Sequence, residues 1–260
     1  MPFRLSDIAV RNFLHLTRIS VIFYKVNDFF SSRNNKKFNF TAFEPLLLFS
    51  VFFLPGYLSQ GMQEFQPDIF ENTWFNLFYI ITTLPQVVLT LYIIMLKPGR
   101  KLSDFDIYGF KLSDLPKSLL ALAGIFVCII PVGLISILIV PEIDNPVVYG
   151  AGWQFSRPSL IPLVLISCIA TGYSEEIFFR AYLVKILEKS GVRLIPAAAV
   201  SAVLFGSGHI YEGFYAFAAT ATIGIFLSFV FNKTKSIHTI SIAHGLYNFS
   251  VLMISMMGAQ

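Results

Sequence analysis

Long apolar stretches separated by short polar segments restrict the fold of this chain more than any other feature. A membrane-spanning helix needs roughly 17 to 25 mostly apolar residues, and seven stretches approach that length. The composition agrees, because 55% of the residues are hydrophobic and only 13% are charged, against about 25% charged in an average soluble domain. We therefore predict an all-α, polytopic membrane helical bundle with about seven transmembrane helices. The stretches are 43–59, 73–96, 118–140, 158–187, 194–210, 214–231 and 237–257.

Lys and Arg are concentrated in every second segment between these stretches, with Arg157 as the single one in 141–157. Five lie in 97–117, for example, and none lies in 60–72. Cytoplasmic loops of membrane proteins are enriched in these residues. The pattern predicts a multi-pass protein of the cell (plasma) membrane with a cytoplasmic N-terminus and an external C-terminus.

The N-terminal segment, residues 1–40, has a different pattern. Arg4, Arg11, Arg18 and Lys25 recur every seven positions among apolar residues. This predicts a basic amphipathic helix that lies on the cytoplasmic headgroups, and a tilted additional membrane segment is the alternative. We expect front transmembrane helices in 41–157 and a core that contains the polar motifs in 158–257.

Charge and cysteine content exclude two other classes of function. The net charge is +4, but the basic residues lie in short segments between apolar runs and not on one face of a soluble fold. Nucleic-acid binding is therefore not expected. Cys128 and Cys168 lie inside apolar stretches without the paired spacing of a metal or redox motif, so we interpret them as packing residues.

Ionisable residues inside the fourth stretch indicate a candidate site, because a charge at the centre of a membrane helix costs about 2.5–3.5 kcal/mol. Glu176 and Arg180 are four residues apart, so they share a helical face and are expected to form an ion pair. Glu175 lies about 100° around the helix from Glu176, so it is expected to have a different partner. It is our candidate general base. The alternative is that both acids pair with Arg180 in a buried network.

The fifth and seventh stretches contribute two imidazoles and a carboxamide to the candidate site. His209 follows the small residues 206–208, which would let another helix or a substrate backbone approach closely. His244 and Asn248 share one helical face and are suited to polarise a carbonyl and stabilise an oxyanion. The alternatives are that His209 has only a structural role, and that His244 and Asn248 only form hydrogen bonds between helices. His15 and His238 are interpreted as interfacial residues.

These motifs resemble those of a known family. Glu175-Glu176-xxx-Arg180, Phe205-xxx-His209 and His244-xxx-Asn248 occur in the order found in CPBP proteins, the CAAX protease and bacteriocin-processing (Abi) family of intramembrane endopeptidases. The resemblance covers residues 160–257. It implies a catalytic Glu175, with His209 and His244 as partners and Asn248 on the oxyanion side, and with Glu176, Arg180 and Phe205 in support. Ala181 departs from the pattern, since a glycine is expected there in many relatives.

The resemblance implies hydrolysis of a peptide bond by water that Glu175 activates. In one mechanism, His209 positions the water while His244 and Asn248 stabilise the oxyanion. In the other, Glu175, His209 and His244 hold a zinc ion as a His₂Glu set, although the chain lacks a His-Glu-xx-His motif. The sequence leaves both open, so the cofactor is either zinc or none. If the fifth and seventh predicted helices begin at residues 194 and 237, His209 and His244 are expected at different depths in the membrane.

The expected partners are the lipid bilayer and a membrane-embedded or lipidated peptide. Prenylated CAAX tails, peptide precursors and membrane-protein tails are all candidate substrates, and the sequence does not predict an oligomeric state. Two other classes of function also place polar residues inside a membrane. One is a non-catalytic scaffold that binds a partner membrane protein, and the other is an ion or proton transporter.

Overall fold

The computed structural model describes residues 40–59, 68–139 and 157–258, and every regular element in these ranges is helical. The predicted amphipathic helix precedes residue 40 and lies outside the described residues. Residues Pro45–Gln260 form one compact unit, and the contacts reported below are internal to it. The α-helices are α2 (Phe40–Phe52), α3 (Leu54–Ser59), α4 (Thr73–Leu96), α5 (Asp114–Ile139), α6 (Ile161–Glu176), α7 (Lys185–Lys189), α8 (Leu194–Gly206), α9 (Phe214–Thr234) and α10 (Ile237–Gly258).

Shorter helical turns connect or continue these helices: η1 (Ile69–Glu71), η2 (Leu102–Phe105), η3 (Pro158–Leu160), η4 (Ile177–Val184) and η5 (Ser207–Glu212). Six described segments are long and apolar enough to cross a membrane: Thr73–Leu96, Asp114–Ser136, Pro158–Lys189, Leu194–Glu212, Phe214–Thr234 and Ile237–Ile254. They correspond to the second to seventh predicted spans. The predicted all-α, multi-pass architecture is confirmed for this part of the chain, and the division at residues 40 and 157 stays a prediction.

The first predicted span, 43–59, is wrong as a single transmembrane helix. The structure divides this segment into α2 and α3, which have 13 and 6 residues. Pro55 accounts for the interruption, because it has no N–H to donate to the carbonyl of Val51 one turn earlier. About seven spans were predicted, and the described residues contain six.

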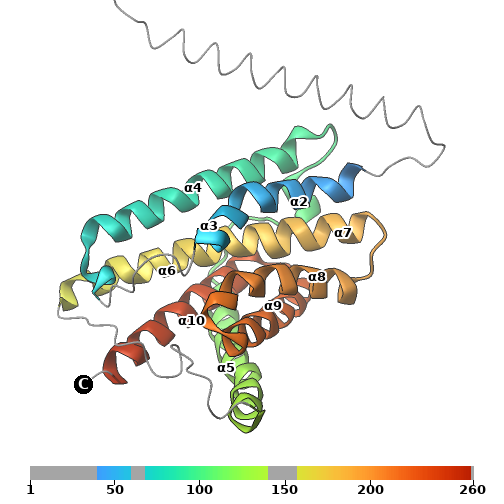
Figure 1. The fold of residues 1–260 in the computed structure, drawn as a ribbon. Coiled ribbons are helices and arrows are strands. Elements are labelled where there is room, and N and C mark those ends of the chain that lie inside the picture. Colours follow the sequence, from blue (N-terminus) through green and yellow to red (C-terminus); the bar gives the residue numbers. More distant parts are fainter. Residues whose placement is uncertain (1–39, 60–67, 140–156, 259–260) are drawn as a thin grey trace, which may run out of the picture. The chain divides into compact units, whose positions relative to one another are not determined.

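The fourth span is continuous, but its hydrogen-bond pattern changes in the middle. Helix α6 passes into η4, a π-helical segment, and α7 continues from it, so the three lie in one line (Figure 1). All residues of η4 are buried, including Ala181, which has no exposed surface. π-Helical segments are rare and occur often at functional sites. Here the segment begins directly after Glu176.

Helix α10 crosses α6 where both backbones carry glycine. A Cβ atom at Gly172 would lie 2.5 Å from the carbonyl oxygen of Ser241 and 2.9 Å from the backbone N of Gly245. A Cβ atom at Gly245 would lie 2.6 Å from Cα of Ile169. No side chain fits between the two helices at this point. The close crossing brings His244, the neighbour of Gly245, to the carboxyl end of α6.

Two hydrogen bonds fix α4 against α6. The Ser167 hydroxyl donates to Asn76 Oδ1 at 3.3 Å, and the Ser174 hydroxyl donates to Gln86 Oε1 at 2.6 Å. Asn76 has no exposed surface, and its amide also donates to two backbone carbonyls. Because Ser174 precedes the two glutamates directly, the second bond helps to set the rotation of α6 at the candidate site.

Gly172→Ala is expected to destabilise the protein by about 1–3 kcal/mol, because the added methyl group meets backbone atoms that cannot move by changing a rotamer. Gly133→Ala in α5 is the matched control, since a Cβ atom there would lie 3.5 Å from the Tyr215 hydroxyl, an ordinary contact. Thermal unfolding of the detergent-solubilised variants measures the difference. Equal apparent Tm values for the two variants would contradict the close crossing of α6 and α10.

Candidate functional site

The predicted ion pair between Glu176 and Arg180 is present and completely buried. Arg180 NH1 lies 2.9 Å from Glu176 Oε1, and neither side chain has exposed surface. The guanidinium also lies over the Phe205 ring, 4.3 Å from its centroid, where the ring face attracts a cation. Each charge compensates the other in an environment in which an isolated charge would be very costly.

The same carboxylate oxygen also binds His244. Nδ1 of His244 lies 2.8 Å from Glu176 Oε1, so the Nδ1–H group donates to the carboxylate. Only 5% of the His244 side chain is exposed. This hydrogen bond fixes the orientation of the ring and directs its Nε2 atom away from Glu176. The sequence analysis did not predict this bond, since it gave Glu176 only Arg180 as a partner.

Glu175 approaches the opposite edge of the same imidazole. Its Oε2 atom lies 3.7 Å from His244 Nε2, which is too long for a direct hydrogen bond. Its side chain is 23% exposed, whereas that of Glu176 is 0% exposed. The adjacent carboxylates therefore have different surroundings, as their separation around the helix predicts.

His209 lies in the turn after the fifth apolar helix. Helix α8 ends at Gly206, and the 3₁₀ turn η5 follows. Nδ1 of His209 lies 3.2 Å from Oε1 of Glu212, an acid to which the sequence analysis gave no role. The sequence signal that could have indicated this pair is the His209-xx-Glu212 spacing, which matches one turn of a 3₁₀-helix.

Phe205 connects the two imidazoles despite their different predicted depths. Its ring centroid lies 6.2 Å from that of His209 and 5.6 Å from that of His244, in edge-to-face arrangements. Glu175 lies close enough to both histidines to interact with them electrostatically. The structure thus brings Glu175 next to His244. His209 and His244 both contact the Phe205 ring.

Asn248 lies one turn after His244 on α10 and is half-buried. Among the described residues, its carboxamide has no hydrogen-bond partner. Its N–H groups are therefore free to act as hydrogen-bond donors. The predicted alignment of His244 and Asn248 along one face therefore agrees with the helix geometry.

Tyr57 of α3 borders the site from the front part of the chain. A Cβ atom at Gly208 would lie 2.5 Å from the Tyr57 ring, so this ring rests on the backbone that precedes His209. Burial, together with the charge of Glu175, raises the pKa of the Tyr57 hydroxyl above its ordinary value. The group therefore stays a neutral hydrogen-bond donor. Sequence analysis missed Tyr57, because the first apolar stretch contains no recognisable motif.

A three-ligand metal site does not fit the arrangement of these residues. Within the described ranges, no group of three His, Cys, Asp or Glu side chains is placed to hold a metal ion. The steps proposed below therefore use only side chains and water.

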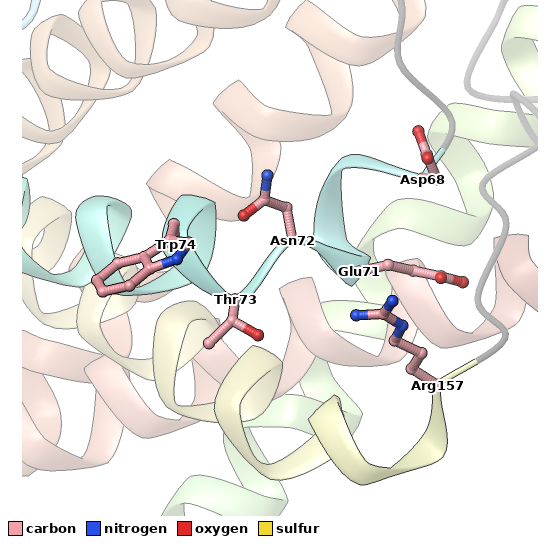
Figure 2. Close-up of a pocket in the computed structure, with 6 residues that line it drawn as sticks. All are labelled: Asp68, Glu71, Asn72, Thr73, Trp74 and Arg157. Atoms are coloured by element: carbon pink, nitrogen blue, oxygen red, sulfur yellow. The ribbon is translucent and has the colours of Figure 1, made fainter.

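A cavity of about 440 Å³ lies away from these residues. It is at the start of α4, and Arg157 borders it from the segment before η3 (Figure 2). Figure 2 shows the Glu71 and Arg157 side chains extending into the same space. None of the predicted site residues lines this cavity, which is formed by Asp68, Glu71, Asn72, Thr73, Trp74 and Arg157.

The six apolar spans and the buried acid–imidazole cluster define a multi-pass membrane protein with a polar site inside its helical bundle. Residues 157–250 match the family model described as "Rce1-like: Type II CAAX prenyl endopeptidase Rce1-like", so this part of the chain is similar to that family of proteases. The match confirms the resemblance drawn from the three motifs. The comparisons with curated proteins and with solved structures found no match.

Proposed function

We propose that this protein is an intramembrane endopeptidase that hydrolyses a peptide bond with water activated by Glu175. The observation that carries the proposal is the position of His244 between two carboxylates. Its Nδ1 atom is bound by the fully buried Glu176, and its Nε2 atom lies 3.7 Å from the partly exposed Glu175. Of these two carboxylates, only Glu175 has exposed side-chain surface.

In the proposed reaction, Glu175 accepts a proton from a water that His209 helps to position. The resulting hydroxide adds to the scissile carbonyl carbon, and the C=O bond becomes a single bond to an oxyanion. Nε2–H of His244 and the amide of Asn248 donate hydrogen bonds to this oxyanion. When the carbonyl re-forms, the C–N bond breaks and Glu175 returns its proton to the leaving amine.

This role requires His244 to carry both ring protons, because Nδ1–H already donates to Glu176. The charges of the cluster then balance: Glu175 and Glu176 are negative, and Arg180 and His244 are positive. A neutral set of this kind is compatible with burial in a membrane interior. Glu176 and Arg180 support the site without touching the substrate.

We propose as substrates proteins or peptides with a lipidated, prenyl-type carboxyl-terminal tail, in accordance with the family description. The five Lys and Arg residues of segment 97–117 support a cytoplasmic position for this segment. A single cysteine introduced there is expected to react with a membrane-impermeant reagent only after the membrane is opened. Reaction in intact cells would reverse the proposed orientation.

The experiment that tests the function uses the purified protein in lipid nanodiscs with matched prenylated and unprenylated precursor peptides. We expect mass spectrometry to find cleavage of the prenylated set, with and without a metal chelator in parallel. Glu175→Gln protein, purified in the same way, is the control for contaminating proteases. Absence of cleavage in every peptide set would contradict the proposal, and ion flux through sealed vesicles without any cleavage would support a transporter instead.

A further inference from the structure

We propose that Glu212 is a positioning residue that fixes the tautomer of His209, so that its Nδ1 atom carries the proton and its Nε2 atom is left as a hydrogen-bond acceptor for the reacting water. This inference rests on the proposed function and adds a residue outside the three motifs. The two ring nitrogens of a histidine have distinct roles, and the partner of one sets the protonation of the other. An ionised carboxylate can only accept hydrogen bonds, so of the two neutral tautomers of His209, Glu212 favours the Nδ1–H form.

The local backbone brings the two side chains together. Nδ1 of His209 and Oε1 of Glu212 are 3.2 Å apart, and both residues lie in the 3₁₀ turn η5. In a 3₁₀-helix the side chains at i and i+3 eclipse each other, whereas in an α-helix they are offset. Gly213 ends the turn with φ +104, a conformation that favours glycine. The turn is thus held to the length that places His209 beside Glu212.

This arrangement has a chemical consequence for the water. With Nδ1 occupied by Glu212, only Nε2 of His209 is free to face other groups. One O–H of the water then donates to Nε2 and the other donates to Glu175. Both hydrogens are directed to protein acceptors, which leaves an oxygen lone pair for the scissile carbonyl.

His244 has a comparable partner in Glu176, but the two carboxylate–imidazole pairs differ in their surroundings. Glu176 has no exposed surface and also binds Arg180. Glu212 is 23% exposed and His209 is 36% exposed. In addition, Arg180 is bound to Glu176 and not to Glu212. The pair formed by His209 and Glu212 can therefore be changed without disturbing the buried network.

The test reads the tautomer directly by NMR of histidine labelled with ¹³C and ¹⁵N. The chain has only 4 histidines, so His209→Asn identifies the His209 signals. In alkaline buffer, we expect the Nδ1–H form of His209 in the wild type and a shift towards the Nε2–H form in Glu212→Met, which has a similar size but no acceptor. Glu188→Met is the matched control, because Glu188 has a comparable exposure of 28% and makes no contact with His209.

The kinetic readout uses the prenylated peptides described above. Glu212→Met is expected to lower kcat by about 10- to 100-fold with little change in KM, a size typical for loss of the residue that orients a functional histidine. Glu188→Met is expected to retain wild-type kcat, and Glu212→Asp, which keeps the carboxylate, is expected to recover part of the loss.

An Nε2–H or doubly protonated His209 in the wild type, or an unchanged tautomer in Glu212→Met, would overturn the proposal. A changed tautomer with unchanged kcat would do so as well. If the wild type cleaves no peptide, the proposed function fails, and the NMR result alone then decides whether Glu212 fixes His209.

Discussion

Glu175→Gln is expected to lower kcat for peptide cleavage by about 10³-fold or more, the upper part of the range for loss of a general base. Glutamine keeps the size of the side chain, but its amide cannot take a proton from water at neutral pH. The fold should be preserved, because Glu175 Oε2 makes no direct hydrogen bond to His244 at 3.7 Å. KM should change little, since the lost interaction acts in the transition state.

Initial rates over a range of substrate concentrations measure this effect, with thermal unfolding recorded on the same samples. Glu188→Gln is the matched control, because it lies in the same span and its side chain is 28% exposed, close to the 23% of Glu175. We expect the control to keep full activity. A variant Glu175→Gln that cleaves at the wild-type rate would remove Glu175 from the mechanism. A cellular phenotype that persists in this variant would favour a scaffold.

The buried ion pair was predictable from the sequence, because Glu176 and Arg180 are four residues apart and local geometry brings such residues together. The distribution of apolar residues likewise located six of the seven predicted spans. The error at 43–59 has a local cause in Pro55, whose effect on a helix can be read from the sequence. Spacing along a single helix is therefore a sound guide to this fold.

Contacts between helices could not be obtained in the same way. Which of two adjacent glutamates binds His244 depends on how α10 crosses α6, and that crossing is set by the contact of Gly172 with Gly245. The pairing of His209 with Glu212 depends on a change from an α-helix to a 3₁₀ turn. Hydrophobic periodicity does not distinguish these helix types over six residues. The motifs thus indicated the residues of the candidate site, but not their partners.

Arg180→Met is expected to destabilise the protein by about 3–5 kcal/mol, the range for removing one partner from a buried ion pair. Methionine fills much of the same space, so the main effect is electrostatic. Glu176 would lose the cation 2.9 Å away and keep only His244 as a partner. Thermal or denaturant unfolding in a mild detergent measures the change. The matched control is Arg193→Met at the exposed start of α8, for which we expect a change within about 0.5 kcal/mol.

A double variant separates the effect of the Arg180 charge on stability from the effect of its packing against Phe205. If Arg180→Met acts through the uncompensated carboxylate, adding Glu176→Gln should recover part of the lost stability, because a neutral amide can still accept the hydrogen bond from His244. If Arg180 acts through its contact with the Phe205 ring, the second substitution will recover nothing. The double variant should still lose peptidase activity, because His244 would no longer have a negative partner at Nδ1 to stabilise its doubly protonated form. Recovery of stability without recovery of activity would therefore assign Glu176 a role in the reaction that is separate from its role in the fold.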